Sequence, residues 1–277
     1  MYADDTQLYI TFKHDLLDES ANRLNLCISD LRCWASRNML KINDAKTEVL
    51  HFSSRFRSYC PSGVTVGNSQ LAPVESARNL GAIFDKHVTM DAQVKNVCKS
   101  TASALRSIGQ IRNYLTKTAT QTLVHSFVTS RLDCCNSLLY GLPQRNLNKL
   151  QTLQNAAVRM ITRAPRRCHT TQILKQLHWL PVEKRIKFKL LLLTYKALNE
   201  LTPSYITDLL SPYVPARNLR SSEQHLLQVP HTSTHSYGER SFQVAAPTLW
   251  NSIPLHIRQS QTVHVFKKLL KTYLFVN

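Results

Sequence analysis

The sequence contains little glycine, six residues among 277. An all-β fold with many tight turns needs glycine where φ is positive, so its scarcity argues against that class. The chain also lacks a long apolar run. The four leucines at 190–193 lie between Lys189 and Lys196, whereas a membrane-spanning helix needs about 20 apolar residues. With no targeting pattern at its start, we expect a protein without a transmembrane segment that is not secreted.

Several motifs of enzymes and metal sites are missing too. The seven cysteines include no CxxC pair, and their odd number predicts reduced thiols in an intracellular protein. Cys134-Cys135 and Cys168-His169 are too isolated to predict a zinc site, and ordinary packing is the favoured interpretation. There is no Walker phosphate loop, no GxSxG and no HExxH, which disfavours the enzyme classes that use them.

Acidic residues are scarce in the second part of the chain. Residues 1–90 hold ten basic and ten acidic side chains, whereas residues 91–277 hold 25 basic and seven acidic ones. The formal charge of +18 therefore belongs to the second part. Cations that replace phosphate counterions gain affinity, so this excess predicts a polyanionic partner. Nucleic acid is the first candidate, and an anionic membrane surface is the weaker one.

The hydrophobic pattern of residues 1–90 mixes strands with one helix. Stretches rich in β-branched and aromatic residues predict strands at residues 6–12, 49–52 and 64–66. Apolar side chains recur at steps of three and four over 15–37, which predicts a helix with Asp15 as its cap and Asn38 at its exit. Residues 79–85 form a further apolar segment with a glycine inside it.

From residue 91 the pattern becomes helical. Apolar positions at helical spacing predict helices over residues 92–114, 118–140, 145–163, 181–201 and 262–275. Polar residues 217–236 predict an exposed loop or a weak hairpin. The expected fold class is α+β and predominantly α-helical. We expect its division into residues 1–88, 89–215 and 216–277.

One motif that can carry chemistry opens the chain, Tyr2-Ala3-Asp4-Asp5. Adjacent aspartates on a strand-to-strand turn offer hard carboxylate ligands for Mg²⁺, which keeps other positions for substrate phosphates. Two such ions about 3.5–4 Å apart stabilise the attacking and leaving oxygens of phosphoryl transfer. Alone, an aspartate pair is more often turn chemistry, because Asp hydrogen-bonds to its local backbone. The pair predicts a metal site only when its sequence context supports one.

That context resembles a known family. Residues 2–6 are similar to the catalytic turn of reverse transcriptases from LINE-type, non-LTR retrotransposons, particularly the jockey-like branch. Residues 38–43 with 46–48 match the next motif of that family, and residues 79–81 with Asp85 match the segment that grips the primer end. The resemblance continues through the basic helices to Trp179-Leu180-Pro181-Val182 and Arg240-Ser241-Phe242. The order and spacing of three motifs carry it.

The resemblance implies roles around the catalytic turn. Asp4 and Asp5 would ligate Mg²⁺ or Mn²⁺, and Tyr2 would lie on the nucleotide or primer side. Lys46 would protonate the leaving pyrophosphate as a general acid. The alternative for Lys46 is a solvated lysine after a turn.

The segment that would grip the primer end is Asn79-Leu80-Gly81. These residues would lie near the primer backbone, where glycine permits close approach. The alternative is a plain strand with a bulge at the glycine.

The resemblance also implies a layout and partners. Residues 1–88 would be part of a palm, 89–215 a helical thumb that holds the primer–template duplex, and 216–277 a C-terminal extension. The basic residues that would contact the nucleic-acid backbone are Lys95, Lys99, Arg106, Lys149, Arg159, Arg163, Arg166 and Arg167. The alternative for each is a solvated cation. Implied partners are an RNA template with a DNA primer or an RNA–DNA hybrid, and dNTP in the full enzyme. They imply a ribonucleoprotein in the nucleus or cytoplasm.

The sequence departs from the family at its start. Complete enzymes carry a third metal-binding aspartate and the fingers before the catalytic turn, whereas Met1 directly precedes Tyr2. We therefore expect an N-terminally truncated chain, with Met1 as a start chosen by gene prediction. Such a chain should be inactive as a polymerase by itself, because positioning and charge stabilisation supply most of the rate.

Two alternatives to a polymerase stay open. One is a non-enzymatic nucleic-acid-binding module retained from the helical region, and the other is a remnant reading frame with no selected role. Primer extension distinguishes the enzyme from the module. Salt-dependent nucleic-acid binding distinguishes the module from the remnant.

Overall fold

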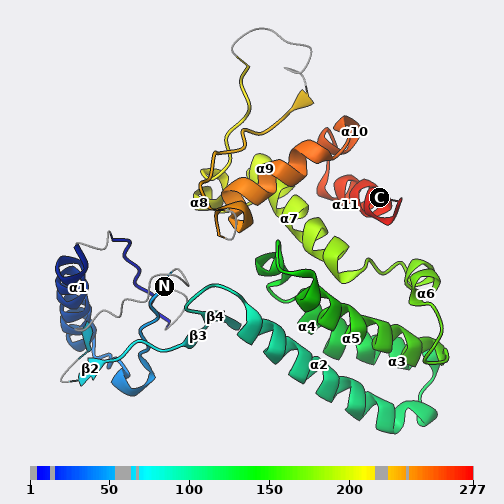
Figure 1. Cartoon of the computed structure of the whole chain (residues 1–277), viewed down its shortest axis with the longest axis horizontal. Helices are drawn as coiled ribbons and strands as arrows, with labels where there is room; N and C mark the ends of the chain where they lie inside the picture. The colour runs from blue at the N-terminus through cyan, green and yellow to red at the C-terminus, as the bar shows by residue number, and fades with distance from the viewer. Residues whose placement is uncertain are drawn as a thin grey trace. The chain divides into compact units, whose positions relative to one another are not determined.

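The computed structural model describes residues 5–12, 16–53, 64–66, 69–215, 224–234 and 237–276. Within these ranges the chain is mostly helical with four short strands (Figure 1), which confirms the predicted α+β class. The contacts divide it into two compact units, which we call the front unit (residues 1–92) and the helical unit (residues 93–277). The predicted three-part division stays a prediction.

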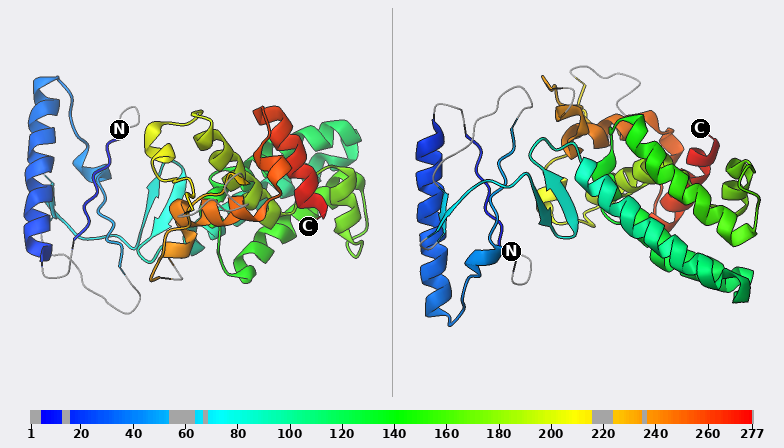
Figure 2. Two further views of the ribbon diagram at one scale, coloured as in Figure 1. Left: turned by 90° about the horizontal axis from the view of Figure 1, so that it is seen from above. Right: turned by 60° about the horizontal axis from the view of Figure 1, so that its bottom comes forward.

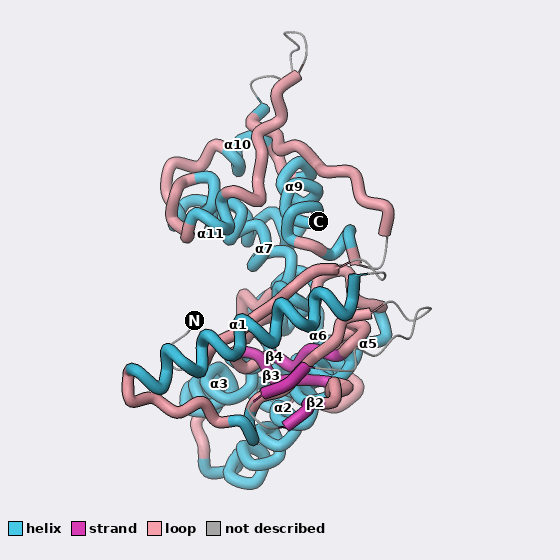
Figure 3. The backbone as a smooth tube through the Cα atoms, turned by 90° about the vertical axis from the view of Figure 1, so that its left-hand side faces the viewer, coloured by secondary structure: helices cyan, strands magenta, loops and turns pink. Residues whose placement is uncertain are grey.

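The front unit combines one long helix with two antiparallel hairpins. Its elements are α1 (Leu17–Arg37), the 3₁₀ turn η2 (Asp44–Lys46), β1 (Val64–Val66), β2 (Ser69–Leu71), β3 (Ser76–Asn79) and β4 (Ala82–Asp85). β1 pairs with β2, and β3 pairs with β4 (Figure 2). The magenta segments of Figure 3 show how short these strands are.

Helix α1 confirms the prediction for residues 15–37. It ends at Asn38 as expected, where the side-chain amide donates to the Trp34 carbonyl at 2.8 Å. Asp15, the predicted cap, lies outside the described residues. The N-cap position is Leu16, which provides no side-chain cap hydrogen bond. Asn25 joins the helix to β1 because its Oδ1 accepts the Thr65 N–H at 2.9 Å.

Two of the predicted strands are wrong. The strand at 64–66 is confirmed as β1, but residues 6–12 and 49–52 form no ladder within the described part of the chain. β-branched residues favour extended backbone, yet a strand also needs a neighbour that completes its hydrogen bonds. Val49 makes one such bond, accepting the Val74 N–H at 2.8 Å.

The helical unit is built from a succession of helices. They are α2 (Asp91–Ile111), η3 (Arg112–Tyr114), α3 (Lys117–Val124), η4 (His125–Thr129), α4 (Ser130–Asp133), η5 (Asn136–Leu139), α5 (Gln144–Thr162), α6 (Thr170–Gln176), α7 (Val182–Leu198), α8 (Ser204–Thr207), η7 (Gly238–Arg240), α9 (Phe242–Ser252), α10 (Leu255–Arg258) and α11 (Val263–Val276). Helices α2, α5, α7 and α11 confirm four of the five predictions. The sequence pattern did not predict α6.

The predicted helix at 118–140 is right at its start and wrong at its end. α3 continues through the π-helical turn η4 into α4, which ends at Asp133. Cys134 is extended and Cys135 is left-handed (φ 52°), so the helix cannot continue. The π turn also rotates the apolar face, since it holds more residues than an α turn. Val124 and Val128 are buried, whereas Phe127 is exposed.

An aromatic core joins α7 to the C-terminal helices. Tyr195 stacks on Phe266 with ring centroids 4.2 Å apart, and Trp250 lies 6.0 Å from Phe266. The Tyr195 hydroxyl donates to the Ser260 carbonyl at 2.7 Å, which satisfies the polar end of this buried ring. Residues on both sides of position 215 thus share one hydrophobic core.

Candidate nucleic-acid interface

The predicted catalytic turn is described only in part. Asp5 is exposed, whereas Tyr2 and Asp4 lie outside the described residues. Lys46 is exposed at the end of η2, and no contact in the described part of the chain joins it to Asp5. A shared catalytic role for these two residues stays a prediction.

The segment that follows Asp5 in the sequence forms hydrogen bonds with one of the predicted primer-side residues. The Asn79 side-chain amide donates to Gln7 Oε1 at 2.9 Å, and Gln7 Nε2 donates back to Asn79 Oδ1. This reciprocal amide pair places Asn79 beside the residues that follow Asp5. The pairing is local to the front unit and links positions 72 residues apart.

Leu80 and Gly81 form a two-residue hairpin turn between β3 and β4. Both have positive φ, 44° and 88°, and Asn79 pairs with Ala82 across the turn. Such a turn matches strand twist when both central residues are left-handed, which glycine tolerates. Leu80 is 53% exposed at the tip, and no atom lies within 4 Å of a Cβ built on Gly81. The residues therefore form a projecting turn, not a strand with a bulge.

Asp85, the last residue of that motif, has a local structural task. Its Oδ1 accepts the Thr89 N–H at 2.8 Å, and its Oδ2 accepts the Met90 N–H at 2.7 Å. The Thr89 hydroxyl and the His87 N–H also donate to this carboxylate. Asp85 thus organises the loop that leads into α2.

Metal-binding chemistry finds no support among the described side chains. No group of three or more His, Cys, Asp or Glu residues in the described ranges could hold a metal ion. Asp5 is one exposed carboxylate, and Mg²⁺ sites use one or two carboxylates together with substrate phosphates. The predicted ligand pair depends on Asp4.

Most of the predicted backbone-contacting cations lie on the surface of the helical unit. Lys95, Lys99 and Arg106 are exposed along α2, and Lys149 is exposed on α5. Burial raises the pKa of the Cys98 thiol on α2, and the charge of Lys149 opposes that rise. The charge of Lys149 thus acts at Cys98, a residue of α2 that lies between Lys95 and Lys99 in the sequence.

The remaining predicted cations surround the end of α5. Arg163, Arg166 and Arg167 are exposed. Arg159 is half-buried and donates to the Cys168 carbonyl at 3.1 Å, while its Nε is buried without a partner among the described residues. Arg159 therefore shapes the loop after α5, and a nucleic-acid contact for it stays a prediction.

Other arginines are engaged in holding the fold, which the charge count does not reveal. Arg112 donates to the carbonyls of Met160 at 2.7 Å and Ile161 at 3.1 Å, near the end of α5. Arg131 donates to the Ser100 carbonyl at 2.6 Å. Further arginines bound to backbone carbonyls are Arg240 and Arg258. The cations available to an external anion are thus fewer than the formal charge suggests.

Ion pairs neutralise little of the helical unit in the part that is described. Asp133 pairs with Arg185 through both carboxylate oxygens, and Glu183 pairs with Lys187 at 2.6 Å. The Lys187 hydrogen bond holds the pKa of Glu183 below its usual value. Neither pair involves a predicted backbone-contacting residue, so those cations keep their charge for an external partner.

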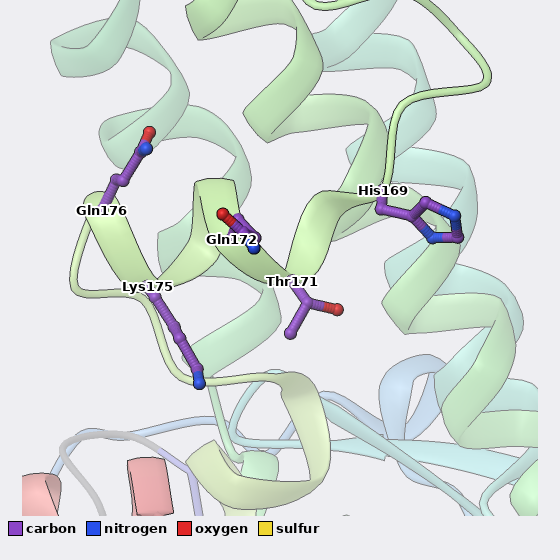
Figure 4. A pocket seen from close by; sticks show the side chains of 5 residues that line it. All are labelled: His169, Thr171, Gln172, Lys175 and Gln176. Carbon is purple, nitrogen blue, oxygen red and sulfur yellow. The ribbon is translucent and has the colours of Figure 1, made fainter.

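An open hollow lined by polar residues lies along α6, and the sequence pattern did not predict it. It is lined by His169, Thr171, Gln172, Lys175 and Gln176 (Figure 4). From Thr171 onward these residues follow the steps of one helix face, while Ile173 and Leu174 are buried. The available signal was that residues 134–182 contain seven basic and no acidic side chains. That interval is the longest uniformly basic part of the helical unit.

Comparison with known proteins gives one informative match. No protein-family model and no solved structure matches the chain. It is similar to the "Probable RNA-directed DNA polymerase from transposon BS" of Drosophila melanogaster, with 27% identity over 191 residues. The match covers 67% of this chain, and the chain spans about a fifth of the length of that protein, 20%. The chain thus resembles an RNA-directed DNA polymerase of a mobile element. No helix in the described ranges is sufficiently long and apolar to span a bilayer.

Proposed function

We propose that this chain is part of a reverse transcriptase of a LINE-type, jockey-like retrotransposon, and that its helical unit holds nucleic acid by the backbone. The observation that carries the proposal is the 27% identity over 191 residues to the Drosophila transposon enzyme. Residues 1–88 then belong to the palm, 89–215 to the thumb and 216–277 to a C-terminal extension.

The front unit supplies the catalytic turn in this proposal. Asp4 and Asp5 ligate Mg²⁺ or Mn²⁺, which would stabilise charge on the transferred phosphoryl group. Tyr2 lines the nucleotide side, and Lys46 is the candidate proton donor. The amide pair between Gln7 and Asn79 supports a common site, because it holds the hairpin turn beside the segment that follows Asp5.

The helical unit binds an RNA template with its DNA primer, or the RNA–DNA hybrid, through phosphate contacts. The exposed cations on α2, on α5 and after α5 support this role because they lack ion-pair partners in the described part of the chain. Phosphate contacts carry no sequence information but fix register and orientation. The binding should therefore tolerate changes of sequence.

A salt series tests this binding. Filter binding of an RNA–DNA hybrid should weaken steeply between about 50 and 200 mM salt. A triple variant with Lys95→Ala, Lys99→Ala and Arg106→Ala should reduce the log–log salt slope by about 2 to 3, roughly one for each lost phosphate contact. The matched control removes three exposed cations of the front unit: Arg23→Ala, Arg37→Ala and Lys41→Ala. Affinity without salt dependence would contradict the proposal.

Primer extension tests the catalytic turn. We expect no extension by the 277-residue polypeptide with Mg²⁺ or Mn²⁺, because it spans a fifth of the length of the Drosophila enzyme. Extension that Asp4→Ala abolishes would overturn that expectation and would identify Asp4 as catalytic. Extension unchanged by Asp4→Ala would remove Asp4 from the proposal.

A further inference from the structure

We propose that α6 and the loop before it contact unpaired nucleobases, so that the helical unit has a base preference in addition to its backbone contacts. Three loop arginines hold phosphates, and the polar side chains of the α6 hollow bind a base edge. This inference rests on the proposed nucleic-acid binding and names a second kind of contact within it.

The two faces of α6 differ in kind. Thr170, Ile173 and Leu174 are buried, and α6 packs on α5. The opposite face carries Thr171, Gln172, Lys175 and Gln176, all exposed. Together with His169 they line one hollow. In Figure 4 the side chains of Lys175 and Gln176 leave the helix in different directions, and the His169 ring lies at the end where α6 begins. The helix is thus fixed by its apolar face and presents a row of hydrogen-bonding groups.

The side chains of this row are unengaged. In the part of the chain that the structure describes, none of the five lining side chains makes a hydrogen bond or an ion pair. The fold therefore does not use them, and their chemistry is free for a ligand. A glutamine side-chain amide offers a donor group and an acceptor side by side, which match the paired acceptor and donor of adenine. The imidazole of His169 can stack on a base.

The electrostatics of the surroundings favour an anion. Residues 134–182 contain no aspartate or glutamate. Arg163, Arg166 and Arg167 are exposed just before α6, and Arg163 is held at the end of α5 in a left-handed conformation (φ 56°). A phosphate near these arginines would be attracted by their three charges, and the segment that carries them contributes no carboxylate.

One feature of α5 would otherwise oppose phosphate binding. The C-terminal carbonyls of a helix carry partial negative charge. Arg112 donates to the carbonyls of Met160 and Ile161, and Arg159 donates to the Cys168 carbonyl in the following loop. These contacts neutralise the end of α5 and order the loop that presents the arginines.

The base must be unpaired. A-form duplexes hide base edges in a deep, narrow major groove, and sequence-specific proteins read RNA mostly where bases are splayed out. The hollow is lined by one short helix and the residue before it, so it suits one base of a single strand. The expected ligand is single-stranded RNA or a strand leaving the duplex.

Fluorescence anisotropy with labelled 12-residue homopolymers of A, C and U tests the inference. The wild-type chain should distinguish the best from the worst homopolymer by roughly tenfold in Kd, the effect of one good amide–base pairing. Gln172→Ala with Gln176→Ala should abolish this preference and leave the salt slope unchanged. Arg163→Ala, Arg166→Ala and Arg167→Ala together should weaken binding to all three polymers and lower the salt slope by about 2 to 3.

The control replaces two exposed glutamines elsewhere, Gln243→Ala and Gln259→Ala, and should keep the preference. Alanine favours helix at positions 172 and 176, so a thermal melt should show the α6 variant folded. Equal affinity of the wild type for all homopolymers, or a preference that survives the α6 variant, overturns the inference and leaves backbone binding intact. Absence of any salt-dependent binding overturns the proposed function and the inference with it.

Discussion

Helices α1 and α2 have the same length, 21 residues, and the same kind of apolar periodicity, yet they are covered very differently. α2 buries six side chains, and Val94, Val97, Leu105 and Ile108 make up its buried apolar face. α1 buries three, of which Leu17 and Ala35 are apolar. Leu24 and Ile28 are half-buried, and Trp34 is 52% exposed.

The N-termini of the two helices also differ, because the N-terminus of α2 is held by more side-chain hydrogen bonds than that of α1. The approach to α2 is organised by Asp85, which accepts hydrogen bonds from three backbone N–H groups and a hydroxyl just before the helix. α1 has Leu16 at its N-cap position, which provides no side-chain hydrogen bond. Asp18 and Glu19 in its first turn contribute negative charge only. Periodicity therefore indicates that a helix forms, while coverage depends on neighbours that the periodicity does not specify.

The largest expected effect compares one leucine from each helix. Leu105→Ala on α2 should lower the free energy of unfolding by about 2–5 kcal/mol, because it opens a cavity at a buried position. Leu24→Ala on α1 should cost about 1 kcal/mol or less, since that side chain is only partly buried. Hydrogen exchange read by mass spectrometry on peptides from each helix measures both. Equal losses of protection would break the comparison.

A second pair of variants compares the helix starts. Asp85→Asn removes one of two acceptor oxygens and should destabilise the start of α2 by about 1–2 kcal/mol, the usual cost of a lost cap. Asp18→Asn removes only a charge near the α1 dipole and should cost about 0.3–1 kcal/mol. Amide exchange of residues 89–95 and 17–23 reports the two effects. A larger acceleration of exchange, relative to the unsubstituted chain, in the α1 variant than in the α2 variant would contradict this order.

The smallest expected effect concerns an ion pair on α7. The pKa of Glu183 is lowered in the folded chain, so the carboxylate binds fewer protons there than in the unfolded chain. Its contribution is present above the unfolded pKa of about 4.3 and is lost as pH falls through the folded value. Half-exposed helix pairs contribute about 0.3–0.5 kcal/mol, so the change is small.

An NMR titration of the Glu183 carboxyl checks that sign. Lys187→Gln should raise the pKa of Glu183 toward its ordinary value, because it removes the hydrogen bond that lowers it. The matched front-unit variant is Lys86→Gln, whose partner Glu75 is 79% exposed, and it should leave stability at neutral pH unchanged. If the pKa of Glu183 does not change in Lys187→Gln, the hydrogen bond from Lys187 is not the cause of its lowered value.

Sequence periodicity was sufficient to predict the long helices, but it did not predict which extended segments pair into a β-sheet. α2 and α5 follow directly from leucine and valine spacing, and the α+β class follows from them. The strand predicted at 6–12 failed because extended propensity does not supply a partner strand. The predicted end of the helix at residue 140 was wrong. The helix ends before Cys135, which is left-handed, and cysteine is not among the residues that favour turns.

The sequence predicts the positive charge of the candidate interface, but it does not predict which of its basic side chains are exposed. Arg159 and Arg163 look alike in the sequence, yet one is half-buried against a carbonyl and the other is exposed. Their difference depends on the path of the loop after α5. α6 was missed because seven residues with two buried apolar side chains give too short a pattern to count.

The aromatic core around Tyr195 has a consequence for how the chain is made. Tyr195 bonds to Ser260, 65 residues further along, and stacks on Phe266 beyond it. During synthesis at about 5–20 residues per second, α7 emerges several seconds before the helices that cover it. Its apolar side is exposed for that interval on a nascent chain still attached to the ribosome. A ribosome stalled between α7 and α11 would therefore present a binding site for chaperones that the finished protein no longer displays.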